Sequence, residues 1–131
     1  MKSTAILIAE DDELLRRDLK GRLFQHGFQV IQAPDRTDIL QLFLDRKPDL
    51  VIIGSSPDNA WDELKVAEQI RQRDRKVPLI LITRHSSETR VITALRAGVN
   101  DYFKIPFSHR DHSTGVRYAV KSGERILRKT M

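Results

Sequence analysis

The strongest constraint on the fold of this chain is a fivefold alternation of a short apolar run with a helical pattern. The apolar runs are residues 5–9, 28–33, 50–53, 79–82 and 101–104. The third and fourth runs are continuously apolar and rich in Val and Ile, which is typical of parallel strands that are buried on both faces. Each run is therefore predicted to be a strand that is followed by a helix.

Between the strands, apolar residues recur at the spacing of a helix. These stripes are Leu15, Leu19 and Leu23; Ile39, Leu40, Phe43 and Leu44; Leu64, Ala67 and Ile70; Val91, Ile92 and Leu95; and Val116, Val120, Gly123 and Leu127. Gly27 and Gly98 are suitable helix stops, and Ser86 or Ser87 can cap the fourth helix. We therefore expect residues 1–131 to form one α/β domain. Its parallel sheet would have five strands with helices on both faces, and its last helix would span about residues 113–128.

In a doubly wound sheet the functional site lies beyond the carboxyl ends of the strands. The residues that follow the first, third, fourth and fifth strands are 10–13 (EDDE), 54–58 (GSSPD), 83–84 (TR) and 105–107 (IPF). Carboxylates such as Glu10 and Asp11 would suit a hard divalent cation, for example Mg²⁺. Asp12 and Glu13 are interpreted as residues that favour the start of the first helix by complementing its dipole.

Composition excludes several classes of protein. The chain has no cysteine, which rules out disulfides, thiolate metal sites and cysteine nucleophiles. No apolar run approaches the roughly 18 residues that are needed to span a bilayer, and the N-terminus has no signal-peptide pattern, so we expect a cytoplasmic protein. The net charge of +5 is concentrated in residues 108–131, which carry six basic residues against two acidic ones.

Four segments, in order and at the right spacing, resemble the receiver domain of response regulators, the phosphoaspartate switch of two-component signalling. They are residues 6–11 (ILIAED), 48–53 (PDLVII), 77–83 (VPLILIT) and 97–107 (AGVNDYFKIPF). The resemblance covers residues 4 to about 127 and implies the flavodoxin-like receiver fold. It also implies an acidic pocket at Glu10 and Asp11 and a switch pair at Thr83 and Tyr102.

Two positions depart from the family's pattern. Gly54 stands where the family has the Asp that accepts the phosphoryl group, and Ile105 stands where the family has a pocket Lys. Lys104 is one residue too early, and a one-residue offset in a strand points a side chain to the opposite face. Glycine supplies no nucleophile, so we expect no catalytic residue and no enzyme activity. No cofactor is expected either, and any magnesium site is reduced to Glu10, Asp11 and Ser56.

The residue after Thr83 is usually small in the family, and here it is Arg84. Loss of an Asp and a Lys together leaves the formal charge of the pocket unchanged, yet Glu10 and Asp11 still repel each other unless a cation is near. Our hypothesis is that Arg84 folds over the pocket and pairs with Asp11 or Glu10. The alternative is that Arg84 points to solvent.

These features favour an atypical receiver, a pseudo-receiver, that works as a phosphorylation-independent interaction module in signal transduction. The family's usual partner face, made by the fourth helix, fifth strand and fifth helix, would bind a signalling protein, a fused effector domain or a second copy of the chain. One alternative is a phosphoreceiver with a relocated acceptor at Asp58, Ser55 or Ser56. Another is a nucleic-acid binder that uses residues 71–76 and the basic last helix, which predicts strongly salt-dependent binding.

Overall fold

Five parallel strands form one sheet in the computed structural model, which describes residues 4–33, 39–54, 62–84, 87–105 and 112–130. The strands are β1 (Ala5–Ala9), β2 (Gln29–Gln32), β3 (Leu50–Gly54), β4 (Leu79–Thr83) and β5 (Asp101–Lys104), and their order in the sheet is β2-β1-β3-β4-β5. The order reverses direction after β2, so β1 and β3 lie on either side of the switch point where α/β sheets form their sites. The predicted fold class is confirmed.

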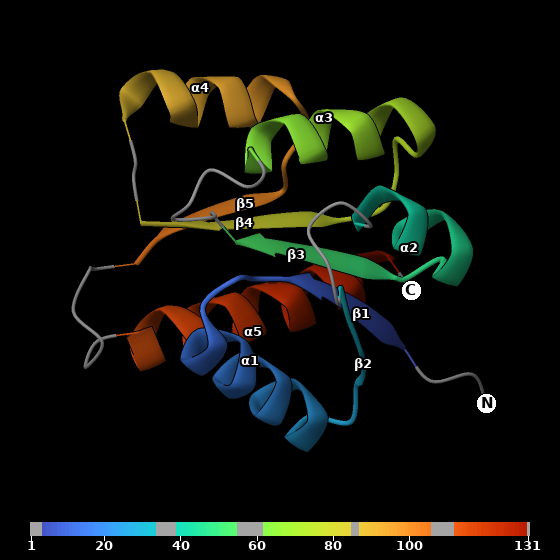
Figure 1. The fold of residues 1–131 in the computed structure, drawn as a ribbon, viewed down its shortest axis with the longest axis vertical. Helices are drawn as coiled ribbons and strands as arrows, with labels where there is room; N and C mark the ends of the chain where they lie inside the picture. The colour runs from blue at the N-terminus through green and yellow to red at the C-terminus, as the bar shows by residue number, and fades with distance from the viewer. Residues whose placement is uncertain (1–3, 34–38, 55–61, 85–86, 106–111, 131) are drawn as a thin grey trace.

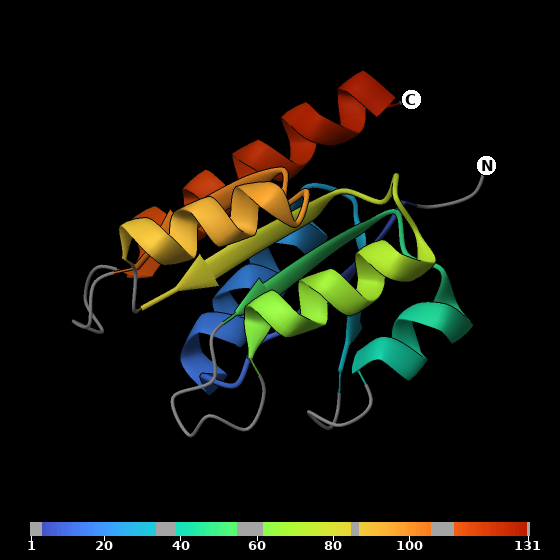
Figure 2. The same ribbon diagram turned by 90° about the horizontal axis from the view of Figure 1, so that it is seen from above.

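Helices cover both faces of the sheet (Figures 1 and 2). The helices are α1 (Glu13–Gln25), α2 (Ile39–Arg46), α3 (Glu63–Arg73), α4 (Glu88–Arg96) and α5 (His112–Thr130). Helices α1 and α5 pack on one face, and α2, α3 and α4 lie on the other. No helix among the described residues is long and apolar enough to span a membrane.

Alternate side chains of each central strand supply the two hydrophobic cores. On β1, Leu7 packs toward α2 and α3, whereas Ile6 and Ile8 pack toward α1 and α5. All residues of β3 and β4 are buried, as expected for strands covered on both faces. This burial on both sides explains why their sequences are continuously apolar instead of alternating.

The ends of the helices follow the capping signals in the sequence. Asp12 caps α1 by accepting a hydrogen bond from the Leu15 N–H, and Ser87 caps α4 through the Arg90 N–H. Gly27 and Gly98 follow α1 and α4 with φ of 85° and 84°, a left-handed conformation that glycine adopts without strain.

The strand register brings the candidate residues together at one edge. Ala9 lies opposite Ile53, Gly54 opposite Ile82, and Thr83 opposite Lys104. The carboxyl ends of β1, β3, β4 and β5 therefore meet at the same edge of the sheet, where the chain continues into Glu10, Arg84 and Ile105.

Candidate functional site

The side chain of Glu10 folds over the backbone of Gly54. A Cβ atom built on Gly54 would lie 2.7 Å from the Glu10 Cδ, and closer still to its Oε1. Real Cβ atoms do not approach other atoms so closely, so any side chain at residue 54 would have to displace the Glu10 carboxylate. The position that the resemblance assigns to the phosphoryl acceptor therefore has no side chain, and a neighbouring carboxylate fills its space.

Glu10 is an unusual carboxyl group because it is only 5% exposed. Its Oε2 accepts a hydrogen bond of 2.8 Å from the Asp12 N–H, but its buried Oε1 accepts none from the described residues. Burial raises the pKa of Glu10 from 4.5 to about 7, against the opposing effects of the Asp12 N–H and the positive charge of Arg84. Asp11, the second acidic residue predicted for the pocket, is partly exposed beside it.

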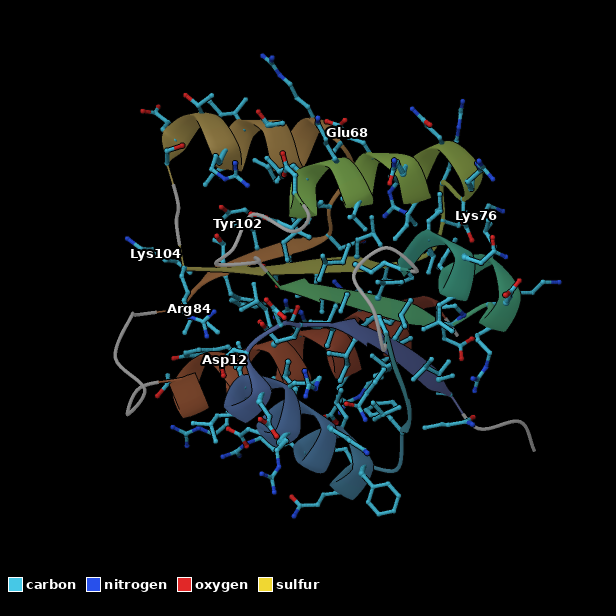
Figure 3. The ribbon with its side chains drawn as sticks, in the orientation of Figure 1. Asp12, Glu68, Lys76, Arg84, Tyr102 and Lys104 are labelled. Carbon is cyan, nitrogen blue, oxygen red and sulfur yellow. The ribbon has the colours of Figure 1, made fainter. Side chains whose placement is uncertain are left out.

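Arg84 pairs with Asp12 across this edge of the sheet (Figure 3). The Arg84 Nη2 donates to the Asp12 Oδ2 at 2.8 Å, and both side chains are largely buried, with 16% and 21% exposure. Asp12 thus uses one carboxylate oxygen to cap α1 and the other to hold Arg84. Sequence reasoning assigned Asp12 only to the start of the helix and named Asp11 or Glu10 as the partner of Arg84. The hydrogen-bonded ion pair joins Arg84 to Asp12, and Arg84 acts on Glu10 through its charge.

The described residues at the end of β5 place no lysine in the pocket. Lys104 is exposed, whereas Ile105 is 1% exposed and belongs to the core under α1 and α5. A Cβ atom on Gly115 of α5 would lie 2.9 Å from the Ile105 Cγ1, so Ile105 packs directly onto that glycine. The side chain at the predicted lysine position is therefore part of the apolar core.

The two switch-like residues are both packed inward. Thr83 is 1% exposed, and its carbonyl accepts a hydrogen bond of 2.7 Å from the Ile105 N–H. Tyr102 packs against the core beneath α3 and α4, and its hydroxyl is buried. That hydroxyl lies close enough to Arg90 to raise the pKa of its guanidinium, although no hydrogen bond of good geometry joins the two groups.

Arg90 forms an ion pair that sequence reasoning missed. Its Nη2 donates to the Oε1 of Glu63, a residue of α3 that is 5% exposed, and lies 3.7 Å from the Asp62 Oδ1. Burial lowers the pKa of Arg90, but Glu63, Asp62 and Tyr102 together raise it above its usual value. This pair joins α3 to α4, and no local pattern in the sequence links two residues that are 27 positions apart.

The basic cluster at residues 71–76 is not a uniformly solvated surface. The Arg71 guanidinium donates five hydrogen bonds, to the carbonyls of Asp74, Val77 and Gly98 (twice) and to the Asn100 side chain. Arg71 therefore holds the end of α3 against the loop between α4 and β5, and this role leaves it unsuited to contact nucleic-acid phosphates.

Ser55, Ser56 and Asp58, the alternative phosphoryl acceptors, lie outside the described residues.

The described residues do not fit a divalent-cation site. They contain no group of three His, Cys, Asp or Glu side chains that converge on one point. One Glu10 oxygen is bonded to the Asp12 N–H, and both Asp12 oxygens are engaged by the Leu15 N–H and Arg84. A metal ion that bound the Asp12 carboxylate or the Glu10 Oε2 would have to compete with these contacts.

Comparison with known proteins agrees with this arrangement of strands and helices. The transcriptional regulatory protein YxdJ of Bacillus subtilis (strain 168) is 33% identical in an alignment 131 positions long, which covers 93% of this chain and 56% of YxdJ. A probable transcriptional regulator, ycf27 of Galdieria sulphuraria, is 34% identical over 92% of this chain and 47% of its own length. The chain thus spans about half the length of these curated relatives.

Solved structures share the fold. The receiver domain of the Francisella response regulator 1452 matches with a TM-score of 0.81 and 21% identity over 98% of this chain and all (100%) of that one. HP1043, an orphan response regulator of H. pylori, matches with a TM-score of 0.73 and 18% identity over 92% of this chain and 96% of that one. The family model of the response regulator receiver domain matches residues 6–116. The chain therefore belongs to the response regulator receiver family.

Proposed function

We propose that this receiver domain is an atypical one that transmits signals through protein contacts without being phosphorylated. The observation that carries the proposal is the position of Glu10 over Gly54. Aspartyl phosphorylation needs a carboxylate nucleophile at the end of β3, and glycine supplies none. The apolar burial of Ile105 removes a second group, since a cation at that position would have held the product phosphate.

The partner surface in this proposal is the face formed by α4, β5 and α5. Ile92, Leu95 and Tyr118 are 42%, 64% and 58% exposed, which is unusual for large apolar side chains. The Tyr118 ring stacks on Phe103 with 6.5 Å between the ring centroids, so an aromatic pair extends the surface from β5 to α5. Such a surface suits a signalling protein, a fused effector domain or a second copy of the chain.

The pair Thr83 and Tyr102 would then be held in one arrangement by the fold itself. Both side chains pack inward, and the ion pair between Arg90 and Glu63 joins α4 to α3. The state of the α4–β5–α5 face would be fixed by these contacts instead of by a bound phosphoryl group. The relatives that are named as transcriptional regulators are about twice as long, so we propose a cytoplasmic regulator in which a further domain supplies the output.

Amide correlation NMR spectra test this proposal. They would be recorded with and without acetyl phosphate and Mg²⁺, on the wild type and on the double variant Glu10→Asp/Gly54→Asp, which restores an acceptor and shortens the overlying side chain. We expect the signals of α4, β5 and α5 to be unchanged in the wild type. Phosphodonor-dependent shifts of those signals in the wild type would refute the proposal and favour an acceptor at Asp58, Ser55 or Ser56.

A further inference from the structure

We propose that Arg84 is the built-in cation of the acidic pocket and that it keeps divalent metal ions out. This inference deepens the proposed function, since it explains how the pocket is stabilised without the metal ion that the family's chemistry calls for. The affinity of the pocket for divalent metal ions can be measured without any phosphodonor.

Three consecutive carboxylates create the need for a cation. Glu10, Asp11 and Asp12 follow β1 directly, and carboxylates this close repel one another unless an opposite charge is near or one of them takes up a proton. Glu10 adds to the electrostatic cost because it is only 5% exposed. One of its carboxylate oxygens accepts no hydrogen bond from the described residues. A buried acid in this state stays ionised only if a positive charge lies close by.

Arg84 meets this need through its position. It follows β4, two strands away from β1 in the sheet, yet its Nη2 lies 2.8 Å from the Asp12 Oδ2. The Arg84 side chain is only 16% exposed, so water screens its charge weakly. This charge lowers the pKa of Glu10, against the effect of burial. Lys104, the corresponding cation on the next strand, is exposed and points away from the pocket (Figure 3).

A guanidinium in this place opposes a metal ion in two ways. It occupies an Asp12 oxygen that a cation would use, and its charge is permanent because arginine does not lose its proton in proteins. A divalent ion beside Glu10 and Asp11 would therefore meet a fixed positive charge at short range. Removal of that charge leaves less positive charge beside Glu10, Asp11 and Asp12, and carboxylate oxygens are the ligands that Mg²⁺ and Mn²⁺ prefer.

The experiment is a titration of Mn²⁺, whose paramagnetism broadens the amide signals of nearby residues, into wild type, Arg84→Ala, Arg84→Gln and Arg16→Ala. Arg84→Gln keeps a hydrogen-bond donor and removes only the charge, so it serves if the alanine variant folds poorly. Arg16→Ala is the matched control, because the Arg16 Nη1 donates to the Glu10 carbonyl at 3.3 Å and its loss removes the same charge near the same site.

We expect both Arg84 variants to bind Mn²⁺ at least about tenfold more tightly than the wild type, with saturable broadening around residues 10–12 and 54. The Arg16 variant should gain much less affinity, because Arg16 donates to the Glu10 backbone carbonyl whereas Arg84 occupies a carboxylate oxygen of Asp12. Equal affinity in wild type and Arg84 variants would overturn the inference, and so would an equal gain in all three variants, which would indicate a general effect of net charge. None of these results depends on whether the domain is phosphorylated.

Discussion

The Glu10 carboxylate lies directly over the α-carbon of Gly54, where any larger residue would begin its side chain. The two residues come from β3 and from the turn that follows β1, strands that are neighbours in the sheet. Glycine at residue 54 therefore does two things: it removes the acceptor carboxylate, and its missing Cβ makes room for the Glu10 side chain. The Glu10 carboxylate occupies the space beside Gly54, so an acceptor side chain at residue 54 requires a change at both positions.

The coupling between these residues can be measured as a free energy of unfolding. We expect Gly54→Ala to destabilise the domain by about 1–3 kcal/mol, because the new Cβ displaces the Glu10 carboxylate. In the Glu10→Ala background the same substitution should be neutral or stabilising, since alanine is favoured over glycine inside a strand. Urea unfolding of the four proteins gives the coupling energy.

Gly21→Ala is the control for glycine replacement, because a Cβ at Gly21 meets no atom within 4 Å. This change in α1 should stabilise the protein by about 0.5–1 kcal/mol through helix propensity. A destabilisation by Gly54→Ala that is as large without Glu10 as with it would show that the carboxylate does not fill the space.

Glu10 makes the stability of the domain depend on pH. The pKa of its carboxyl is 4.5 when exposed and about 7 in the folded protein. Between these values the unfolded chain loses the proton first, so stability falls as the pH rises from about 4.5 to about 7 and then levels off. The full effect is about 3 kcal/mol, and it should be absent in Glu10→Gln.

The measurement is the free energy of unfolding of wild type and Glu10→Gln from pH 4 to pH 8, where the difference between the two proteins cancels other titrating groups. Glu10→Gln should be the more stable protein above pH 7. A difference that does not change with pH would mean that Glu10 titrates normally and is not buried as described.

Arg90 should contribute to stability by compensating the buried charge of Glu63. Arg90→Ala leaves that carboxylate, which is 5% exposed, without its hydrogen-bonded partner. We expect a loss of about 2–3 kcal/mol, and recovery of a large part of it in Arg90→Ala/Glu63→Gln, where no charge remains buried. Thermal or urea unfolding reports both values.

The control is Arg96→Ala, an exposed change on the same helix, which should shift the free energy of unfolding by less than about 0.5 kcal/mol. Equal effects of Arg90→Ala and Arg96→Ala would contradict this role.

Replacement of Arg71, even by lysine, should lower the stability of the domain. Its five hydrogen bonds use the whole planar fork of the guanidinium, and an ammonium group cannot reach the same set of acceptors. We expect Arg71→Lys to cost about 1–3 kcal/mol, whereas Arg73→Lys, on the exposed side of α3, should be nearly neutral. Similar stability of the two variants would show that Arg71 is only a surface charge.

Local patterns predicted the framework of the fold because strands and helices depend on residues that are close in sequence. The apolar runs gave β3 and β4 nearly to the residue, and the glycines at 27 and 98 marked the ends of α1 and α4. The resemblance then placed Gly54 and Ile105 at the edge of the sheet where the structure has them. What remained open was which side chains touch there.

Those contacts depend on register and on long-range packing, which no local pattern encodes. Arg84 and Asp12 are 72 residues apart, and no pattern within either segment links the two side chains. The folding of Glu10 onto Gly54 needs the exact pairing of β1 with β3. Arg71 looked like part of a solvated basic run, because only the folded chain brings the Gly98 carbonyl to its guanidinium.

The most direct test of the account is the intact mass of the wild-type protein after incubation with acetyl phosphate and Mg²⁺. The variant Glu10→Asp/Gly54→Asp/Arg84→Ala, which restores an acceptor and removes the Arg84 charge, is treated in parallel. We predict that the wild type gains no phosphoryl group, while the triple variant gains one that hydroxylamine removes, as expected for an acyl phosphate. A stoichiometric mass gain in the wild type, lost on substitution of Asp58, Ser55 or Ser56, would contradict the account and identify the acceptor.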